Sequence, residues 1–593
     1  MVCHVRNTSQ KLNGLLSISS IILTTIGIIV LVFFLRNVDN GASTILLFAG
    51  SIILAAGNVL AFLSVTYHRA PFFFVLFVTA FFLMTMYDIR FNVLQGSDIA
   101  FEYVSAKTTL ETNTWSLARA AAGDRYFTAA SISLFPAIVS KITGVNLMFV
   151  FQWVMRAVLA LLPLAIFQTI QEIFGDIKLS ALSALIFVQF YYNFNLLNFL
   201  IRQGVAELFL VLTIYSLVKV YKGKNSFAFA LVSVFSMLGL VVSHYTLDYW
   251  TIMIFVGIFI LCWAVSRFPK QLLSFFKFSN FKGEKQVING VFLIFFICLS
   301  LFWIYFTNII PFLTDVHNEI YLISNLLVHT PGAVAATTPT SSWFLNNPAG
   351  PVVGFWLDFV LVLVPAGFLC LLFRFRKEPV HMPWIMGGLV MMAFVAVWVV
   401  SGKAMLGVFV DRVITMGVPF FVTFVAASIL LLQRKLLSNK KRVVQVLATA
   451  IVVIILVVNL PMNMIVPTYQ RYVLYQPIQS VNPAVAINQD IIGVNEFAAS
   501  VWLDQHASGS STYYTDFTNQ WFYAIWNVSV DYSETTPINN TGTYFLLDHY
   551  NLQLGMWEGP VSTLHFPVND LLGNSCVVYS DGDSAIIAKN NNI

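Results

Sequence analysis

The chain is organised around residues 96–103, whose sequence is GSDIAFEY. This stretch places Asp98 and Glu102 shortly after an apolar run that ends near Tyr87. If the stretch is helical, the i, i+4 spacing puts both carboxylates on one face. Carboxylates at the end of an apolar bundle are costly unless they are solvated or paired, so their position suggests a function. The alternative is a polar loop that only ends a membrane-spanning helix.

The composition is that of a polytopic membrane protein. Of the 593 residues, 58% are hydrophobic and only 10% are charged, and the mean hydropathy is +0.80. These values exclude a soluble globular protein. The five cysteines are scattered and form neither a disulfide framework nor a zinc-binding spacing.

The apolar runs predict about thirteen membrane spans of about 20 residues each. We expect a break at residues 243–245, SHY, rather than one long kinked span. The predicted spans lie near residues 15–35, 43–66, 71–88, 146–171, 179–197, 204–219, 226–243, 246–265, 287–309, 352–373, 383–400, 412–433 and 443–461.

The distribution of Lys and Arg predicts the orientation of these spans. Short loops such as 219–224, 267–285 and 434–442 are basic, whereas residues 311–351 contain no Lys or Arg. The positive-inside rule then places the N-terminus in the cytoplasm and the tail from about residue 462 outside the cell. We therefore predict a multi-pass protein of the cell membrane.

The polar tail predicts a small α/β domain. Asn495 can cap a helix that extends to Trp502. Residues 511–515 and 544–547 are β-prone, and residues 576–579 and 585–588 flank a turn as a hairpin.

Ionisable side chains gather at the predicted outer ends of the spans. Each has an ordinary alternative: Arg202 and Arg412 can be interfacial anchors, Glu207 can pair with Arg202, and His244 can be structural. The set comprises Asp98, Glu102, Arg119, Asp124, Arg125, Arg202, Glu207, His244, Asp248, Lys403, Asp411 and Arg412.

An outer-face reaction has no nucleotide sugar or ATP available, so its donor must cross the bilayer on a lipid carrier such as a polyprenyl-phosphate sugar. The donor phosphate would need cations, for which Arg202, His244 and Arg412 are the candidates. The acceptor hydroxyl would need a carboxylate base, for which Asp98 and Glu102 are the candidates. Glu207, Asp248 and Arg125 would support them.

The chain resembles the GT-C superfamily of membrane glycosyltransferases, including archaeal predicted membrane proteins of that superfamily. The resemblance rests on GSDIAFEY at residues 96–103, RQGVAE at 202–207 and SHY at 243–245. It implies an inverting glycosyltransferase with Asp98 as the catalytic base. Glu102 would assist it or help to bind a metal, and the resemblance leaves a divalent Mg²⁺ or Mn²⁺ open.

The resemblance also suggests the domain boundaries. The acidic loop follows the third predicted span rather than the first, so residues 1–70 form an added helical hairpin. A GT-C-like transmembrane catalytic domain then covers 71–461, with outer loops 89–145 and 311–351, and an extracytoplasmic α/β domain covers 462–593. The Trp-Trp-Asp signature of oligosaccharyltransferases is absent, which favours transfer of a single sugar.

Besides a non-catalytic surface receptor or anchor, two other functions remain open at this stage. One is an O-antigen-type glycan polymerase or ligase, although the lack of Lys and Arg in residues 311–351 argues against it. The other is a secondary transporter, which would carry charges near the midplane and inverted repeats. The expected partners are the polyprenyl-phosphate sugar, membrane lipid and a glycan, lipid or protein acceptor, with no nucleic acid.

Overall fold

A computed structural model gives the structure of the protein. It describes residues 2–37, 43–91, 94, 97–121, 126–189, 201–267, 287–307, 363–374, 379–400, 409–437, 513–515, 530–532, 544–547, 556–558, 563–565, 575–580 and 585–589.

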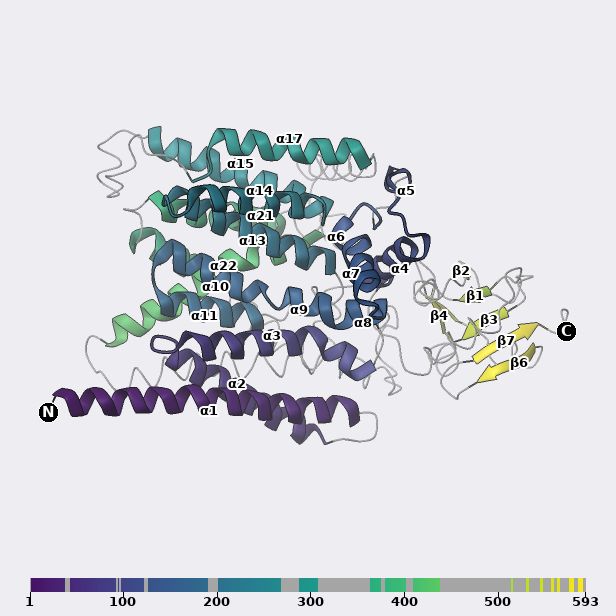
Figure 1. Ribbon diagram of the computed structural model, residues 1–593, viewed down its shortest axis with the longest axis horizontal. Coiled ribbons are helices and arrows are strands. Elements are labelled where there is room, and N and C mark those ends of the chain that lie inside the picture. Colours follow the sequence, from purple (N-terminus) through teal and green to yellow (C-terminus); the bar gives the residue numbers. More distant parts are fainter. Residues whose placement is uncertain are drawn as a thin grey trace.

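Three long apolar helices begin the chain, and α1 runs along one edge of the bundle (Figure 1). Helices α1 and α2 pack closely at Gly27, which has no side chain. A Cβ at this position would lie only 2.6 Å from the backbone nitrogen of Leu54. The Asn58 amide and the Thr79 hydroxyl hydrogen-bond between α2 and α3, at 3.2 Å. The three helices are α1 (Val2–Asn37), α2 (Thr44–Ser64) and α3 (Arg69–Phe91).

Short helices follow α3 before the chain enters the next long apolar segment. Helix α6 packs against α4 and α7, so this region forms a compact layer at one end of the bundle (Figure 1). Its members are α4 (Ser97–Thr112), α5 (Leu117–Ala121), α6 (Ala130–Ser133) and α7 (Phe135–Thr143).

The segment from Leu147 to Phe174 contains a π-helical turn, η2. Such turns insert an extra residue and are frequent at functional sites. The segment ends at Gly175, whose φ of 67° is the left-handed conformation that terminates helices. Its elements are α8 (Leu147–Phe149), η2 (Val150–Met155), α9 (Arg156–Leu159) and α10 (Leu162–Phe174).

The remaining helices complete the bundle, with α17 along the edge opposite α1 (Figure 1). A further helix covers residues 363–374. The others are α11 (Ile177–Gln189), α13 (Ile201–Tyr221), α14 (Ser226–Val241), α15 (Tyr245–Arg267), α17 (Gly290–Thr307), η3 (Pro379–His381), α21 (Met382–Val400) and α22 (Phe409–Leu437).

Seven helices in the described part of the chain are long and apolar enough to cross a membrane, and six shorter helices are also apolar. The protein is therefore a multi-pass membrane protein. The break predicted at residues 243–245 is confirmed, because α14 ends at Val241 and α15 begins at Tyr245. The predicted span at 443–461 and the loop at 311–351 lie outside the described residues.

Seven strands are described near the C-terminus. The predicted hairpin is confirmed by the antiparallel pairing of β6 with β7. A five-stranded sheet has the order β2-β1-β3-β7-β6, with β1 parallel to β2 and β3, and β4 pairs separately with β5. The helix predicted from Asn495 lies outside the described residues. The strands are β1 (Tyr513–Thr515), β2 (Val530–Tyr532), β3 (Tyr544–Leu547), β4 (Met556–Glu558), β5 (Thr563–His565), β6 (Ser575–Ser580) and β7 (Ala585–Lys589).

Candidate active site

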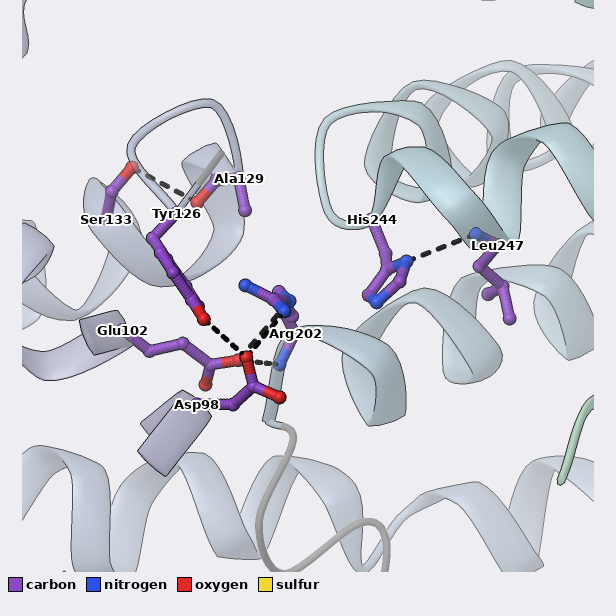
Figure 2. A network of polar contacts seen from close by, with 8 residues as sticks. All are labelled: Asp98, Glu102, Tyr126, Ala129, Ser133, Arg202, His244 and Leu247. Atoms are coloured by element: carbon purple, nitrogen blue, oxygen red, sulfur yellow. Dashed lines mark hydrogen bonds and ion pairs between the residues drawn. The ribbon is translucent and has the colours of Figure 1, made fainter. Parts of the chain in front are cut away.

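Helix α4 presents Asp98 and Glu102 to the start of α13. Asp98 lies in the first turn of α4, where the helix dipole favours negative charge. Both carboxylates contact Arg202, as Figure 2 shows, so the predicted common face is confirmed. Residues far apart in the sequence therefore meet at one end of the bundle.

Arg202 links the two carboxylates. Its Nη2 lies 2.9 Å from Asp98 Oδ1, and its Nε lies 3.7 Å from Glu102 Oε1. Its backbone N–H also donates to Glu102 Oε1, at 3.4 Å. The Arg202 side chain is 1% exposed and that of Glu102 is 0% exposed, whereas that of Asp98 is 23% exposed. Asp98 is thus the one member of this group that solvent and ligands can reach.

Tyr126 also contacts the Asp98 carboxylate (Figure 2). Its hydroxyl donates to Asp98 Oδ1 at 2.6 Å. The Arg202 guanidinium lies 4.4 Å from the centroid of the Tyr126 ring, a cation–π distance. Phe101 stacks on the Tyr126 ring at 4.8 Å. Asp98 therefore has a defined orientation and a cationic neighbour.

Ser133 and Trp115 brace the turn that follows Tyr126. The Ser133 hydroxyl donates to the carbonyl oxygens of Phe127 and Ala129, at 3.0 and 3.1 Å. The Trp115 indole N–H donates to the Ser133 hydroxyl at 3.1 Å. This network connects the last residue of α6 to the loop after α4, and so helps to keep Tyr126 in place.

Glu102 differs from Asp98 in its electrostatics. Burial raises the pKa of the Glu102 carboxyl from 4.5 to about 8, while the Arg202 guanidinium acts to lower it. At neutral pH this makes Glu102 mainly protonated. Asp98 is then the principal ionic partner of Arg202.

His244 lies in the connection between α14 and α15, across from Arg202 (Figure 2). Its Nδ1 accepts a hydrogen bond from the backbone N–H of Leu247 at 3.1 Å, so it caps the start of α15. The ring stacks on Tyr245 at 5.6 Å. His244 is at the same end of the bundle as Asp98, but it has a structural contact of its own.

The supporting residues take different positions. Glu207 is buried in α13 and its Oε1 accepts from Gln203 Nε2 at 3.1 Å, so its contact is with Gln203 and not with Arg202. Asp248 is buried in α15 and accepts from the Ser300 hydroxyl of α17 at 2.8 Å. Arg125 and the side chain of Arg412 lie outside the described residues.

Sequence reasoning missed an ion pair between Asp88 and Arg156. Arg156 Nε lies 3.4 Å from Asp88 Oδ2, and both side chains are 1% exposed. The signal was present, because each residue lies within or at the end of an apolar run, where charges are rare. Tyr126 was also missed, and nothing in the sequence distinguishes it from the chain's other tyrosines.

The two carboxylates do not fit a divalent metal in this arrangement. Mg²⁺ requires several oxygen ligands around it, and the Arg202 guanidinium occupies the position between Asp98 and Glu102. Among the described residues, no cluster of three His, Cys, Asp or Glu side chains could hold a metal ion. The positive charge beside Asp98 comes from the protein itself.

Comparison with solved structures shows the fold. The oligosaccharyltransferase AglB from Archaeoglobus fulgidus, in complex with an inhibitory peptide and a dolichol-phosphate, is 10% identical, with a TM-score of 0.50 over 89% of this chain and 75% of that one. ArnT from Cupriavidus metallidurans bound to undecaprenyl phosphate is 10% identical, with a TM-score of 0.45 over 88% of this chain and 98% of that one. The fold of the protein is therefore similar to that of AglB.

Sequence comparison identifies the family of the chain. No curated protein matches the chain. The family described as predicted membrane protein (DUF2206) matches residues 229–590, which is more than half of the sequence. The chain belongs to this DUF2206 family of predicted membrane proteins.

Proposed function

We propose that the protein is an inverting glycosyltransferase that moves a single sugar from a polyprenyl-phosphate donor to a glycan, lipid or protein acceptor. The reaction would take place on the extracytoplasmic side of the membrane. The observation that carries the proposal is the partly exposed Asp98, which is oriented by Arg202 and Tyr126.

Asp98 has the properties required of a general base. It is accessible enough for an acceptor hydroxyl to come within hydrogen-bond reach. Arg202 places a positive charge 2.9 Å from it, and the Tyr126 hydroxyl restricts its orientation. Glu102, which is buried behind it, assists by holding the Arg202 backbone and side chain.

The proposed reaction is a direct displacement. The acceptor oxygen attacks the anomeric carbon of the donor sugar while its proton passes to the Asp98 carboxylate. The bond between the anomeric carbon and the phosphate oxygen breaks, and the polyprenyl phosphate leaves with the electron pair. Attack from the face opposite the leaving group inverts the configuration at that carbon.

The donor phosphate would be bound near Arg202. The Arg202 Nη1 is buried and has no hydrogen-bond partner among the described residues, so it can donate to a phosphate oxygen. His244 and Arg412 are the other proposed phosphate contacts. The dolichol-phosphate in the AglB complex supports a donor of this chemical class.

The arrangement of domains around this site is also a proposal. Residues 1–70 would be an added hairpin, residues 71–461 the catalytic domain, and residues 462–593 an extracellular domain. The N-terminus would be cytoplasmic, which places Asp98 at the outer face.

Transfer of tritiated hexoses from polyprenyl-phosphate donors tests the proposed function. Membranes that contain the wild type should transfer label to endogenous acceptors, and membranes that contain Asp98→Asn should transfer about 100-fold less or lower still. Glu172→Gln serves as the matched carboxylate control and should retain transfer. Glu172 lies in the last turn of α10, away from Asp98 in α4. Equal transfer by the wild type and Asp98→Asn would remove Asp98 from its role.

A further inference from the structure

A basic cluster lies at the turn between α13 and α14, at the end of α13 opposite Arg202. Three ammonium groups surround the single carboxylate of Glu172. The Nζ atoms of Lys219, Lys222 and Lys224 lie 2.6, 3.3 and 3.5 Å from its oxygens. Lys222 Nζ also donates to the backbone oxygen of Glu172. We call Lys219, Lys222 and Lys224 the basic turn.

The basic turn carries more positive charge than Glu172 can neutralise. Three lysines face one carboxylate, which leaves an excess of two positive charges. Lys219 is largely buried, whereas the Lys224 side chain is 62% exposed. Each ammonium group has three N–H donors, so Lys222 and Lys224 can bind a further anion without releasing Glu172.

The backbone holds these two lysines in a tight connection. Gly223 and Asn225 have φ values of 69° and 46°, in the left-handed region. Such residues allow a sharp reversal between helices. Lys222 and Lys224 therefore lie where the apolar helix α13 ends and the apolar helix α14 begins.

An exposed apolar stripe begins immediately after the basic turn. Phe227, Leu231, Phe235 and Leu238 are exposed large hydrophobic residues of α14. Their spacing of three to four residues puts them on one face of the helix. The opposite face of α14 is buried against the protein, with Ser233, Met237 and Leu240 among its buried residues.

We propose that the basic turn and the α14 stripe form a binding site for an anionic glycerophospholipid. Lys222 and Lys224 would donate to the phosphate oxygens, and an acyl or alkyl chain would lie along Phe227, Leu231 and Phe235. Basic pockets between membrane helices bind anionic headgroups in this way. The adjoining apolar stripe favours a lipid over free phosphate, which has no tail to cover it.

This site is separate from the one that contains Asp98. Lys219 is 17 residues from Arg202 along α13, which corresponds to about 26 Å at 1.5 Å per residue. The inference therefore does not rest on the proposed glycosyl transfer.

Native mass spectrometry of the delipidated full-length protein, titrated with phosphatidylglycerol, tests the site. Lys222→Gln/Lys224→Gln should bind phosphatidylglycerol about 10- to 30-fold more weakly than the wild type, because two lysines near the phosphate are lost. Binding of zwitterionic phosphatidylcholine should be weak and equal in both proteins. Lys219 is kept, because its ammonium group lies closest to Glu172 and takes no part in the proposed contact with the phosphate.

A charge-matched control separates a site from general attraction. Lys107→Gln/Lys141→Gln also removes two positive charges, but from α4 and α7, and it should bind phosphatidylglycerol as the wild type does. Equal weakening by both double variants, or none by Lys222→Gln/Lys224→Gln, would overturn the site. Release of bound phosphatidylglycerol by millimolar inorganic phosphate would show that the turn takes free phosphate, and would also overturn it.

Discussion

Two buried arginines of this protein pair with aspartates and differ in what surrounds the carboxylate. In the pair of Asp88 with Arg156, both side chains are 1% exposed. In the pair of Asp98 with Arg202, the arginine is equally buried but the aspartate is 23% exposed. The first carboxylate is sealed between helices, whereas the second can meet a substrate.

The contacts around the two pairs follow the same distinction. Arg156 comes directly after the π-helical turn η2 and joins this segment to α3 through Asp88, at 3.4 Å. Asp98 has a shorter contact with Arg202, at 2.9 Å, and a second donor in the Tyr126 hydroxyl. A sealed pair is expected to stabilise the fold, and an accessible and oriented one is expected to carry chemistry. The difference between the two pairs can be tested by making equivalent substitutions in both. Equal effects on stability and transfer at the two pairs would contradict it.

The largest effect is expected for Arg202→Met. It leaves Asp98 and Glu102 together without their shared cation, and removing one partner from a buried ion pair costs about 3–5 kcal/mol of stability. Unfolding in mixed micelles should show this loss, and transfer should disappear. Arg202→Lys keeps the charge but loses the fork geometry, so it should recover stability more than transfer. A stable and fully active Arg202→Met would contradict the role of this residue.

Asp88→Asn is expected to lower the free energy of unfolding by about 3 kcal/mol, because it removes the carboxylate charge that lies 3.4 Å from the buried Arg156 guanidinium. The same unfolding measurement checks this value. The folded fraction should still transfer sugar at a rate within about tenfold of the wild type, since the ion pair of Asp88 is with Arg156 and not with Arg202. A loss of transfer without any loss of stability would place this pair in the chemistry instead.

The raised pKa of Glu102 predicts a pH-dependent stability. Its folded value of about 8 lies above its ordinary value of 4.5, so the folded state binds the proton more tightly. This stability is fully present below pH 4.5 and is lost as pH rises through 8. Between pH 7 and pH 8 the free energy of unfolding should fall by about 1 kcal/mol. Glu102→Gln should flatten the profile, and an unchanged slope would show that Glu102 is ionised in the fold.

Glu172→Gln should have the smallest effect. Glu172 and its lysines are partly exposed, and such ion pairs contribute about 0–1 kcal/mol. Thermal melting should change little, and transfer should not change. A large loss of stability would mean that the basic turn holds α10 and α13 together more strongly than its exposure indicates.

The sequence predicted those features that depend on local pattern. Apolar run lengths located the helices, and the i, i+4 spacing of Asp98 and Glu102 anticipated their common face, but not that this face meets Arg202. The pairing of Asp88 with Arg156 depends on how α3 and α9 rotate against one another, whereas Glu207 contacts Gln203 one turn away within α13. The π-helical turn η2 changes the rotation of the helix that follows it, and the sequence of residues 150–155 has no periodicity that predicts this turn.

Tyr126 illustrates the same limit. Its position beside Asp98 depends on the turn that Ser133 and Trp115 hold together, which involves residues from three separate segments. A tyrosine is common in both membrane interfaces and cores, so its residue type carries little information. The charged residues at this end of the bundle were therefore predictable from the sequence, but their geometry was not.

The most direct test of the central claim compares Asp98→Asn with Asp88→Asn in one single-turnover assay. Both purified variants receive the same labelled polyprenyl-phosphate donor, and rates are normalised to the folded fraction. Asp98→Asn should be at least about 100-fold slower than Asp88→Asn. Equal rates in the two variants would contradict the assignment of Asp98 as the base.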